Sequence, residues 1–330
     1  MKKFSYLFAI VLIAILTSCN KDFTTEQERP DINMLHFDSY SEMKQELSVV
    51  LKMTTDEKIE WAAQKDFNSF GANADEFYES MDINQFKSEE ELMSFVANSE
   101  YLEIVNGNDG EKSVLARESE SRYFYFINED RMFSVEDKVV KVFGNKTVIT
   151  CIDNLDQLKR IQSVDEISDN PTYEVKNRET IELKSYPGCG FSDEDWGVDG
   201  DYRIWLEVWC EEDWSSWDNV KYTRTGWFAH AQKYVLGVWV DHLTNITYHI
   251  HLHTGYLRYV PVDGGIVVWT TYAYDSERTT SSAARASGEK EEVAAPFNLA
   301  TNTYFQEIDC WAYTNRVSYD DRAEVGPCEE

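Results

Sequence analysis

The second half of the chain alternates apolar and polar residues over several short runs. Within residues 202–209, Ile204, Leu206 and Val208 fall on one face, because successive side chains of a strand point to opposite sides. Similar runs occupy 220–229, 233–240, 244–253, 256–260, 266–274 and 304–314. Short strands separated by turn residues predict an all-β domain of the sandwich type, and closure into a barrel stays open.

The first half carries helix signals followed by strand signals. Helices are predicted at 41–51, at 54–62 after a capping-box-like start, and at 88–95. Short strands are predicted at 101–105, 123–127, 132–135, 139–143 and 147–151, before a helical piece at 155–161. Helices that precede a small antiparallel sheet predict an α+β domain.

The tryptophans divide the chain. Nine of the ten lie between Trp196 and Trp311, and the polar run 163–182 precedes them. We therefore expect an α+β domain at 36–180 and a β-sandwich-like domain at 181–330. The segment 276–296 is too polar for a core and is predicted to be a long loop between two strands.

The N-terminus reads as an export signal. It begins with two lysines after Met1, runs apolar over residues 4–16 and ends at Leu16-Thr17-Ser18-Cys19. These four residues resemble the lipobox of bacterial lipoproteins. The resemblance implies that residues 1–18 are removed, that Cys19 is acylated with palmitate-type chains, and that 19–35 tether the protein to the outer membrane. The cell surface and the periplasmic face both stay open.

Two segments of the first half carry a further resemblance. The stretches Phe37–Phe70 and Ile127–Val142 are similar to the N-terminal region of uncharacterised outer-membrane lipoproteins of gut Gram-negative anaerobes. The shared pattern contains no known catalytic residue, so the resemblance implies location and not activity.

The charge of the chain limits its partners. The formal net charge is −29, and such a field repels phosphate backbones. Nucleic acid is therefore not an expected partner. Cations, neutral glycans and envelope proteins suit this charge better.

The cysteines predict disulfides in the second half. Cys189, Cys210, Cys310 and Cys328 could form two disulfides in any of three connectivities in an oxidising compartment, or could remain thiols. Cys151 ends an apolar run and is predicted to be a buried core thiol.

The run "HIHLH" places His249, His251 and His253 on one face of a strand, a spacing that zinc ligands can have. We expect this strand to pair with 233–240 on one side and, after a turn at Thr254-Gly255, with 256–260 on the other. Those neighbours supply Lys233 and Arg258 but no carboxylate. The favoured interpretation is a solvated polar face, and a zinc site is the alternative.

Two acidic segments, 192–201 and 211–219, carry Trp196, Trp214 and Trp217, which we expect in turns. Exposed aromatic rings beside carboxylates can stack on sugar rings and bind their hydroxyls, whereas buried rings would only cover the end of the sandwich. Three acids of the first segment could also bind calcium through oxygen ligands, namely Asp195, Asp199 and Asp201.

No short catalytic motif is present, no residue is assigned a catalytic role, and no cofactor is predicted. The sequence favours a non-catalytic binding or adhesion module for a glycan or a protein. A metal-dependent hydrolase on the histidine face and a structural envelope assembly protein are the alternatives.

Overall fold

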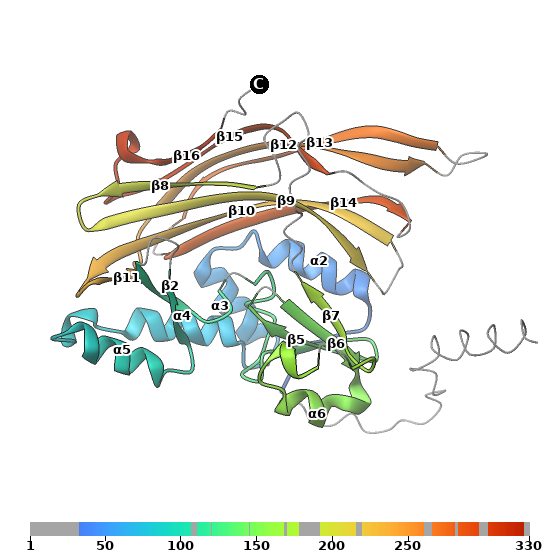
Figure 1. Cartoon of the computed structure of the whole chain (residues 1–330), viewed down its shortest axis with the longest axis horizontal. Coiled ribbons are helices and arrows are strands. Elements are labelled where there is room, and N and C mark those ends of the chain that lie inside the picture. The colour runs from blue at the N-terminus through green and yellow to red at the C-terminus, as the bar shows by residue number, and fades with distance from the viewer. Residues whose placement is uncertain are drawn as a thin grey trace, which may run out of the picture.

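The computed structural model describes residues 33–106, 111–119, 121–144, 146–167, 170–177, 192–215, 220–260, 266–280, 283–296 and 303–326. Strands predominate in these residues, and most of the helices lie in the first part of the chain (Figure 1). Cys19 and Trp217 lie outside the described residues, as do Cys189 and Cys328.

The predicted helices are confirmed. The described helices are α2 (Tyr40–Val50), α3 (Thr55–Gln64), α4 (Phe70–Ser80), α5 (Glu89–Ala97) and α6 (Leu155–Arg160). Side chains of Ser39, Thr54, Ser69 and Ser88 accept hydrogen bonds from backbone N–H groups of the first turns, which the helix itself leaves without partners. Thr54 and Glu57 form the expected capping box. Helix α4 was not predicted.

A five-stranded sheet follows the helices, in the order β1-β4-β5-β6-β7. Its strands are β1 (His36–Phe37), β4 (Met132–Val135), β5 (Lys138–Phe143), β6 (Lys146–Cys151) and β7 (Glu174–Asn177). Apolar residues cover both of its faces, and Leu158 of α6 belongs to the smaller of the two cores. The strand predicted at 123–127 is wrong, because this segment forms a series of turns.

A curved seven-stranded sheet contains strands from both parts of the chain. Its order is β2-β3-β11-β10-β9-β8, and β14 also pairs with β10. The strands are β2 (Leu102–Asn106), β3 (Lys112–Ala116), β8 (Ser192–Asp199), β9 (Tyr202–Ser215), β10 (Val220–Val235), β11 (Val238–Asp241) and β14 (Arg285–Pro296).

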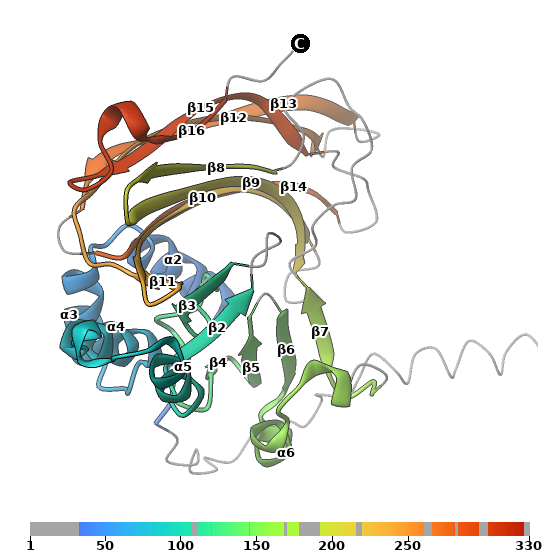
Figure 2. The ribbon, with the colours of Figure 1, turned by 60° about the vertical axis from the view of Figure 1, so that its left-hand side comes forward.

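A four-stranded sheet packs on the outer side of the curved sheet (Figure 2). Its order is β13-β12-β15-β16, with β12 (Ile246–Val260), β13 (Ile266–Thr279), β15 (Tyr304–Thr314) and β16 (Ala323–Val325). The core between the two sheets contains the predicted inward residues Ile204, Leu206 and Val208, all fully buried. The prediction that the second half forms two sheets packed around a common core is confirmed.

Three details of the second half differ from the prediction. The polar segment 276–296 is not one long loop: β13 continues to Thr279, and β14 pairs along β10 from Val220 to His230. Residues Thr254-Gly255 form no turn, because β12 is one continuous strand. The tight turn lies instead at Leu236-Gly237, where both φ angles are positive (53° and 93°).

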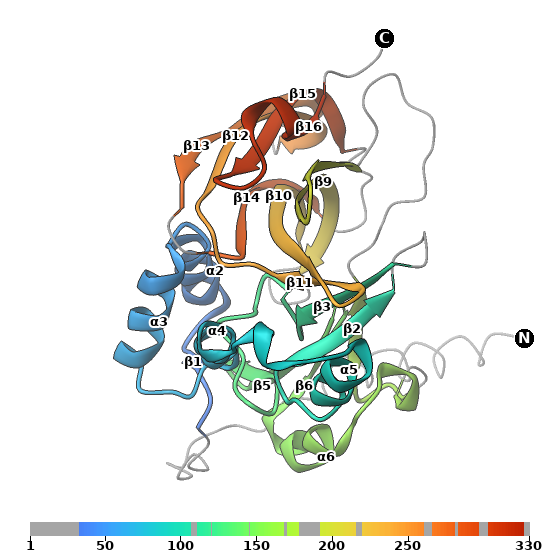
Figure 3. The same ribbon diagram turned by 90° about the vertical axis from the view of Figure 1, so that its left-hand side faces the viewer.

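The two halves are joined through the curved sheet. Strand β11 pairs in parallel with β3, and Val238 and Val240 belong to the same core as the N-terminal helices. The boundary expected near residue 180 is therefore crossed by a sheet and by a core. Figure 3 shows α2, α3 and α4 on the side of the curved sheet that faces away from β12 and β13.

No helix among the described residues is long and apolar enough to cross a membrane.

Candidate functional site

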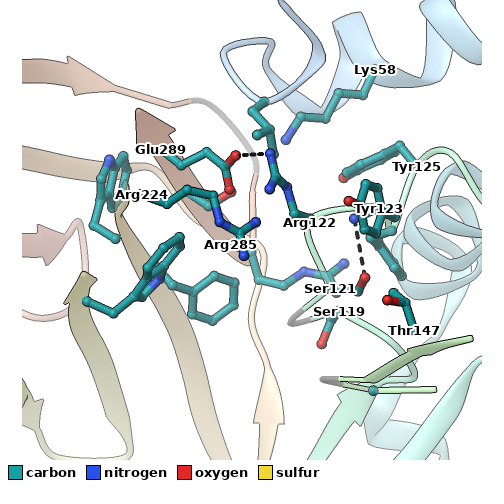
Figure 4. A pocket seen from close by; sticks show the side chains of 18 of the residues that line it. Lys58, Ser119, Ser121, Arg122, Tyr123, Tyr125, Thr147, Arg224, Arg285 and Glu289 are labelled. Atoms are coloured by element: carbon teal, nitrogen blue, oxygen red, sulfur yellow. Dashed lines mark hydrogen bonds and ion pairs between the residues drawn. The ribbon is translucent and has the colours of Figure 1, made fainter. Parts of the chain in front are cut away.

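A cavity of about 160 Å³ lies between the concave face of the curved sheet and the N-terminal half. We call it the inner cavity. Strands β9, β10 and β14 form one wall, while α3, α4, β6 and the segment 119–125 contribute to the other. Figure 4 shows Arg224 and Glu289 on the sheet side, and Lys58, Tyr125 and Thr147 on the opposite side.

Charged side chains of both signs line the inner cavity in equal number. Three largely buried arginines form ion pairs with largely buried carboxylates of other elements, as Arg122–Glu289, Arg224–Glu211 and Arg285–Asp75. The full set of charged lining residues is Lys58, Arg122, Lys176, Arg224 and Arg285 with Asp75, Glu79, Glu207, Glu211 and Glu289. The formal charge of the lining is therefore zero, in a chain of −29.

Asp75 of α4 is the centre of one cluster in this wall. Its carboxylate accepts hydrogen bonds from the Arg285 guanidinium and from the Tyr125 hydroxyl. The Lys58 ammonium lies 4.7 Å from the centre of the Tyr125 ring. Burial lowers the pKa of Lys58 to about 8, although attraction to Asp75 opposes this shift.

Two arginine N–H groups in the inner cavity remain available. Arg122 Nε and Arg285 Nη1 are buried and have no hydrogen-bond partner among the described residues. Buried polar groups are nearly always hydrogen-bonded, by protein, water or ligand. The hydroxyls of Ser119, Ser121 and Thr147 line the same space (Figure 4).

Aromatic rings complete the walls. Trp209, Trp227 and Phe228 come from the curved sheet, and Tyr123 and Phe124 come from the opposite segment. The inner cavity thus combines flat apolar faces with donors and acceptors, which is the composition typical of small-molecule sites.

The tryptophans of the predicted ligand site lie in other elements than expected. Trp196 and Trp214 lie on strands β8 and β9 and not in turns, because both acidic segments extend the curved sheet. Trp196 is 41% exposed, and its ring stacks on that of Trp205 at 5.5 Å between centroids. Trp217 lies outside the described residues.

The histidines alternate with buried residues as predicted. His249, His251 and His253 are partly exposed, whereas Ile250 and Leu252 are buried. Their neighbours were predicted wrongly. Strand β12 pairs with β13 and β15, and not with 233–240 or 256–260.

Carboxylates therefore do lie beside the histidines. Asp275 Oδ1 lies 2.5 Å from His251 Nδ1, and Glu307 Oε2 lies 3.9 Å from His251 Nε2. Glu277 lies 3.7 Å from His249 Nδ1. The hydrogen bond that the protonated ring donates to Asp275 raises the pKa of His251, and burial of the ring opposes this shift. Among the described residues, no group of three or more histidine, cysteine or acidic side chains is arranged to hold a metal ion.

The acids proposed as calcium ligands flank the hairpin between β8 and β9. Gly200 has a φ of +59° in its turn. The Asp195 carboxylate accepts a hydrogen bond from the backbone N–H of Glu324 at 2.9 Å, which ties β8 to β16.

Of the two alternatives predicted for the four C-terminal cysteines, two disulfides are ruled out. Cys210 and Cys310 are buried thiols in the sandwich core and are not in disulfides. Cys151, predicted to be a core thiol, is disulfide-bonded. Spacing along the chain does not reveal which cysteines meet in space.

The cavity arginines were missed by the sequence reasoning. Arg285 lies in the segment predicted to be a loop, and Arg122 lies in a segment between predicted strands. Arg224 left no usable signal either, because a charged residue between Thr223 and Thr225 in a predicted strand would ordinarily be assigned to an exposed face.

Comparison with known proteins gives little about function. No protein-family model matches the chain, and no curated protein does. Among solved structures, a crystal structure of a DUF4848 family protein from Bacteroides thetaiotaomicron, a gut anaerobe, is similar over 90% of this chain and 98% of that chain. The identity is 17% and the TM-score is 0.29. A likeness at this level supports no conclusion about activity or ligand.

Proposed function

We propose that this protein is a lipid-anchored, non-catalytic binding module of the outer membrane whose inner cavity holds a neutral, hydroxyl-rich ligand, that is, a glycan. One observation carries the proposal: the arginines of the inner cavity are already paired with carboxylates, yet Arg122 Nε and Arg285 Nη1 keep unused donors. These two N–H groups can therefore donate further hydrogen bonds to a ligand, whereas the positive charges of both arginines are already neutralised by carboxylates.

The balance of charge argues for a neutral ligand. An anionic ligand would add a negative charge to a lining whose formal charge is zero, beside Glu289, Glu211 and Asp75. A buried charge without a partner is costly, typically by several kcal/mol. A sugar hydroxyl carries no charge, and it can accept from arginine and donate to a carboxylate at the same time.

The aromatic walls suit the apolar faces of sugar rings. Trp209 and Phe228 stand on the same sheet face as the Arg224–Glu211 pair, because all four belong to strands β9 and β10 that pair directly. Ring faces next to charge-assisted donors and acceptors match the mixed polarity of a pyranose.

A calorimetric titration tests the proposal. We expect neutral oligosaccharides to bind at least about tenfold more tightly than uronate or sulfated ones of equal length. Arg122→Gln should weaken binding by about tenfold or more, since hydrogen bonds to charged groups contribute about 1.5–3 kcal/mol. Arg258→Gln, on an exposed part of β12, is the matched control. A preference for anionic ligands would contradict the proposal.

The anchor is proposed from the sequence of residues 16–19. Metabolic labelling with a fatty acid that carries an alkyne should mark the intact protein and not Cys19→Ala. Protease added to whole cells should then decide whether the anchored protein faces the exterior or the periplasm.

The metal-dependent hydrolase remains the less favoured alternative. The structure gives His251 the neighbouring carboxylate that the sequence did not predict, Asp275. A zinc site needs about four ligands, however, and the described residues offer no cluster of that kind.

A further inference from the structure

Two tryptophans form a stacked pair directly beside the inner cavity. The pairing of β8 with β9 places Trp196 opposite Trp205, so both rings lie on one face of the sheet. Their centroids are 5.5 Å apart and their planes differ by 15°. Trp196 is exposed and Trp205 is half-buried, although large aromatic residues are usually mostly buried.

The pair is continuous with the inner cavity. Alternation along β9 puts Trp205, Glu207 and Trp209 on one face, and the last two line the cavity. The Trp205 ring also meets Phe228 edge-on at 5.8 Å, and Phe228 lines the cavity. Along the strand, Trp205 and Trp209 are about 13 Å apart, which exceeds the length of a single sugar ring.

Neighbouring charges hold the stacked pair in place. The Arg203 guanidinium lies 4.1 Å from the centre of the Trp196 ring and 4.0 Å from that of Trp239. Arg203 also pairs with Glu111 at 2.8 Å. The Trp205 indole donates to the exposed Glu194 carboxylate at 3.0 Å. The rings are therefore fixed before a ligand arrives, and each nearby charge has an opposite partner or faces water.

We infer that Trp196 and Trp205 form a second sugar-binding subsite, so that the ligand is an oligosaccharide chain lying along β9 from the inner cavity to the edge strand β8. This inference rests on the proposed glycan function. It adds that affinity depends on the length of the oligosaccharide. One sugar unit occupies the inner cavity, and the following units stack on the two tryptophans. Rigid, pre-positioned rings reduce the entropy lost on binding.

Trp196→Ala tests the inference, with binding measured by calorimetry for neutral gluco-, manno-, galacto- and xylo-saccharides of increasing length. We expect affinity for the longer oligomers to fall about five- to tenfold, because a lost aromatic contact is of that size. Affinity for the monosaccharide should not change. Trp269→Ala is the matched control, since Trp269 of β13 is 42% exposed and does not line the inner cavity.

The outcomes separate the inference from the function on which it rests. The second subsite is overturned if the wild-type protein binds a monosaccharide as tightly as its oligomers, or if Trp196→Ala leaves oligomer binding unchanged. In that case the contact of Arg203 with the Trp196 ring only stabilises the edge of the sheet. If Trp196→Ala weakens both lengths equally, the subsite is likewise overturned. If no saccharide of any length binds the wild type, the glycan function itself fails. Unchanged thermal unfolding of the variant verifies that it is folded.

Discussion

Two histidine–aspartate pairs in this protein have the same chemistry and opposite surroundings. His230 and Asp241 join β10 to β11 with side chains that are 3% and 0% exposed. His251 and Asp275 join β12 to β13 with side chains that are 34% and 67% exposed. The comparison teaches that burial, and not the identity of the partners, decides what such a pair contributes, because water competes for the exposed charges and screens them.

The same contrast separates two larger surfaces. In the inner cavity, three acidic side chains are paired with arginines and are largely buried between the curved sheet and the N-terminal half. On the outer face of the four-stranded sheet, Glu277 and Glu307 lie near histidines and remain mostly exposed. The charged groups of the first surface are largely buried and fixed by ion pairs, whereas those of the second surface are solvated.

The largest effect is expected from breaking the buried pair. His230→Phe leaves the Asp241 carboxylate buried, and its Oδ2 already has no hydrogen-bond partner among the described residues. We expect the free energy of unfolding in urea to fall by about 3–5 kcal/mol. Adding Asp241→Leu should recover most of this loss. A cost below about 1 kcal/mol for the single variant would show that the pair behaves like an exposed one.

A somewhat smaller effect is expected at the inner cavity. Arg285→Met removes the guanidinium from Asp75, but the Tyr125 hydroxyl still donates to that carboxylate. We expect a loss of about 2–4 kcal/mol in urea unfolding, since one buried charge keeps a single hydrogen bond. The comparison variant at a more exposed ion pair is Arg322→Met, where the side chains of Arg322 and its partner Glu324 are 22% and 48% exposed; it should cost less than about 1 kcal/mol. Equal losses would contradict the role of burial.

Contacts between uncharged hydroxyl groups extend the comparison of buried and exposed pairs. Thr225 contacts the hydroxyls of Thr254 at 2.6 Å and Tyr272 at 2.8 Å, all buried between the two sheets of the sandwich. Thr225→Val should cost about 1–2 kcal/mol by leaving these hydroxyls short of a partner. Thr247→Val breaks the exposed Thr247–Thr279 contact and should change stability by less than about 0.5 kcal/mol.

The smallest effect is expected at the exposed histidine, and it depends on pH. Because the hydrogen bond with Asp275 raises the pKa of His251, the protonated ring stabilises the fold. That contribution is complete below the unfolded pKa of about 6.5 and is lost as pH rises through the higher folded value. His251→Ala should therefore cost at most about 1 kcal/mol at pH 5.5 and nothing at pH 9. NMR titration of His251 verifies the direction, and a pKa below 6.5 would contradict it.

The helices show how much of the fold the sequence predicts. Their starts follow from local chemistry: Thr54 and Ser88 cap the backbone a few bonds away, and the sequence contains both partners of each contact. Helix α4 was missed although Ser69 caps it, because its first turn is Phe-Gly-Ala and carries no acidic residue to mark a helix start.

The strands show where prediction fails. Alternation gave the buried faces of β9 and β12 correctly, but not the neighbours of His251. A period of two specifies which side of a strand is apolar, and any partner with a matching face satisfies it. The choice among partners depends on packing between segments far apart in the chain, such as β14 along β10.

The sequence by itself determined the acidic charge, which follows from composition, and the helix caps and the apolar face of each sandwich strand, which depend on residues that are neighbours along the chain. The export signal with Cys19 stays a prediction from the sequence. Only the tertiary structure decided that Asp75, Arg122 and Arg285 meet in one cavity. These residues come from a helix, a turn segment and a strand up to 210 positions apart, as in the Arg285–Asp75 contact. No local sequence pattern predicts that these three residues lie close together, because their proximity results from the burial of the core that both halves share.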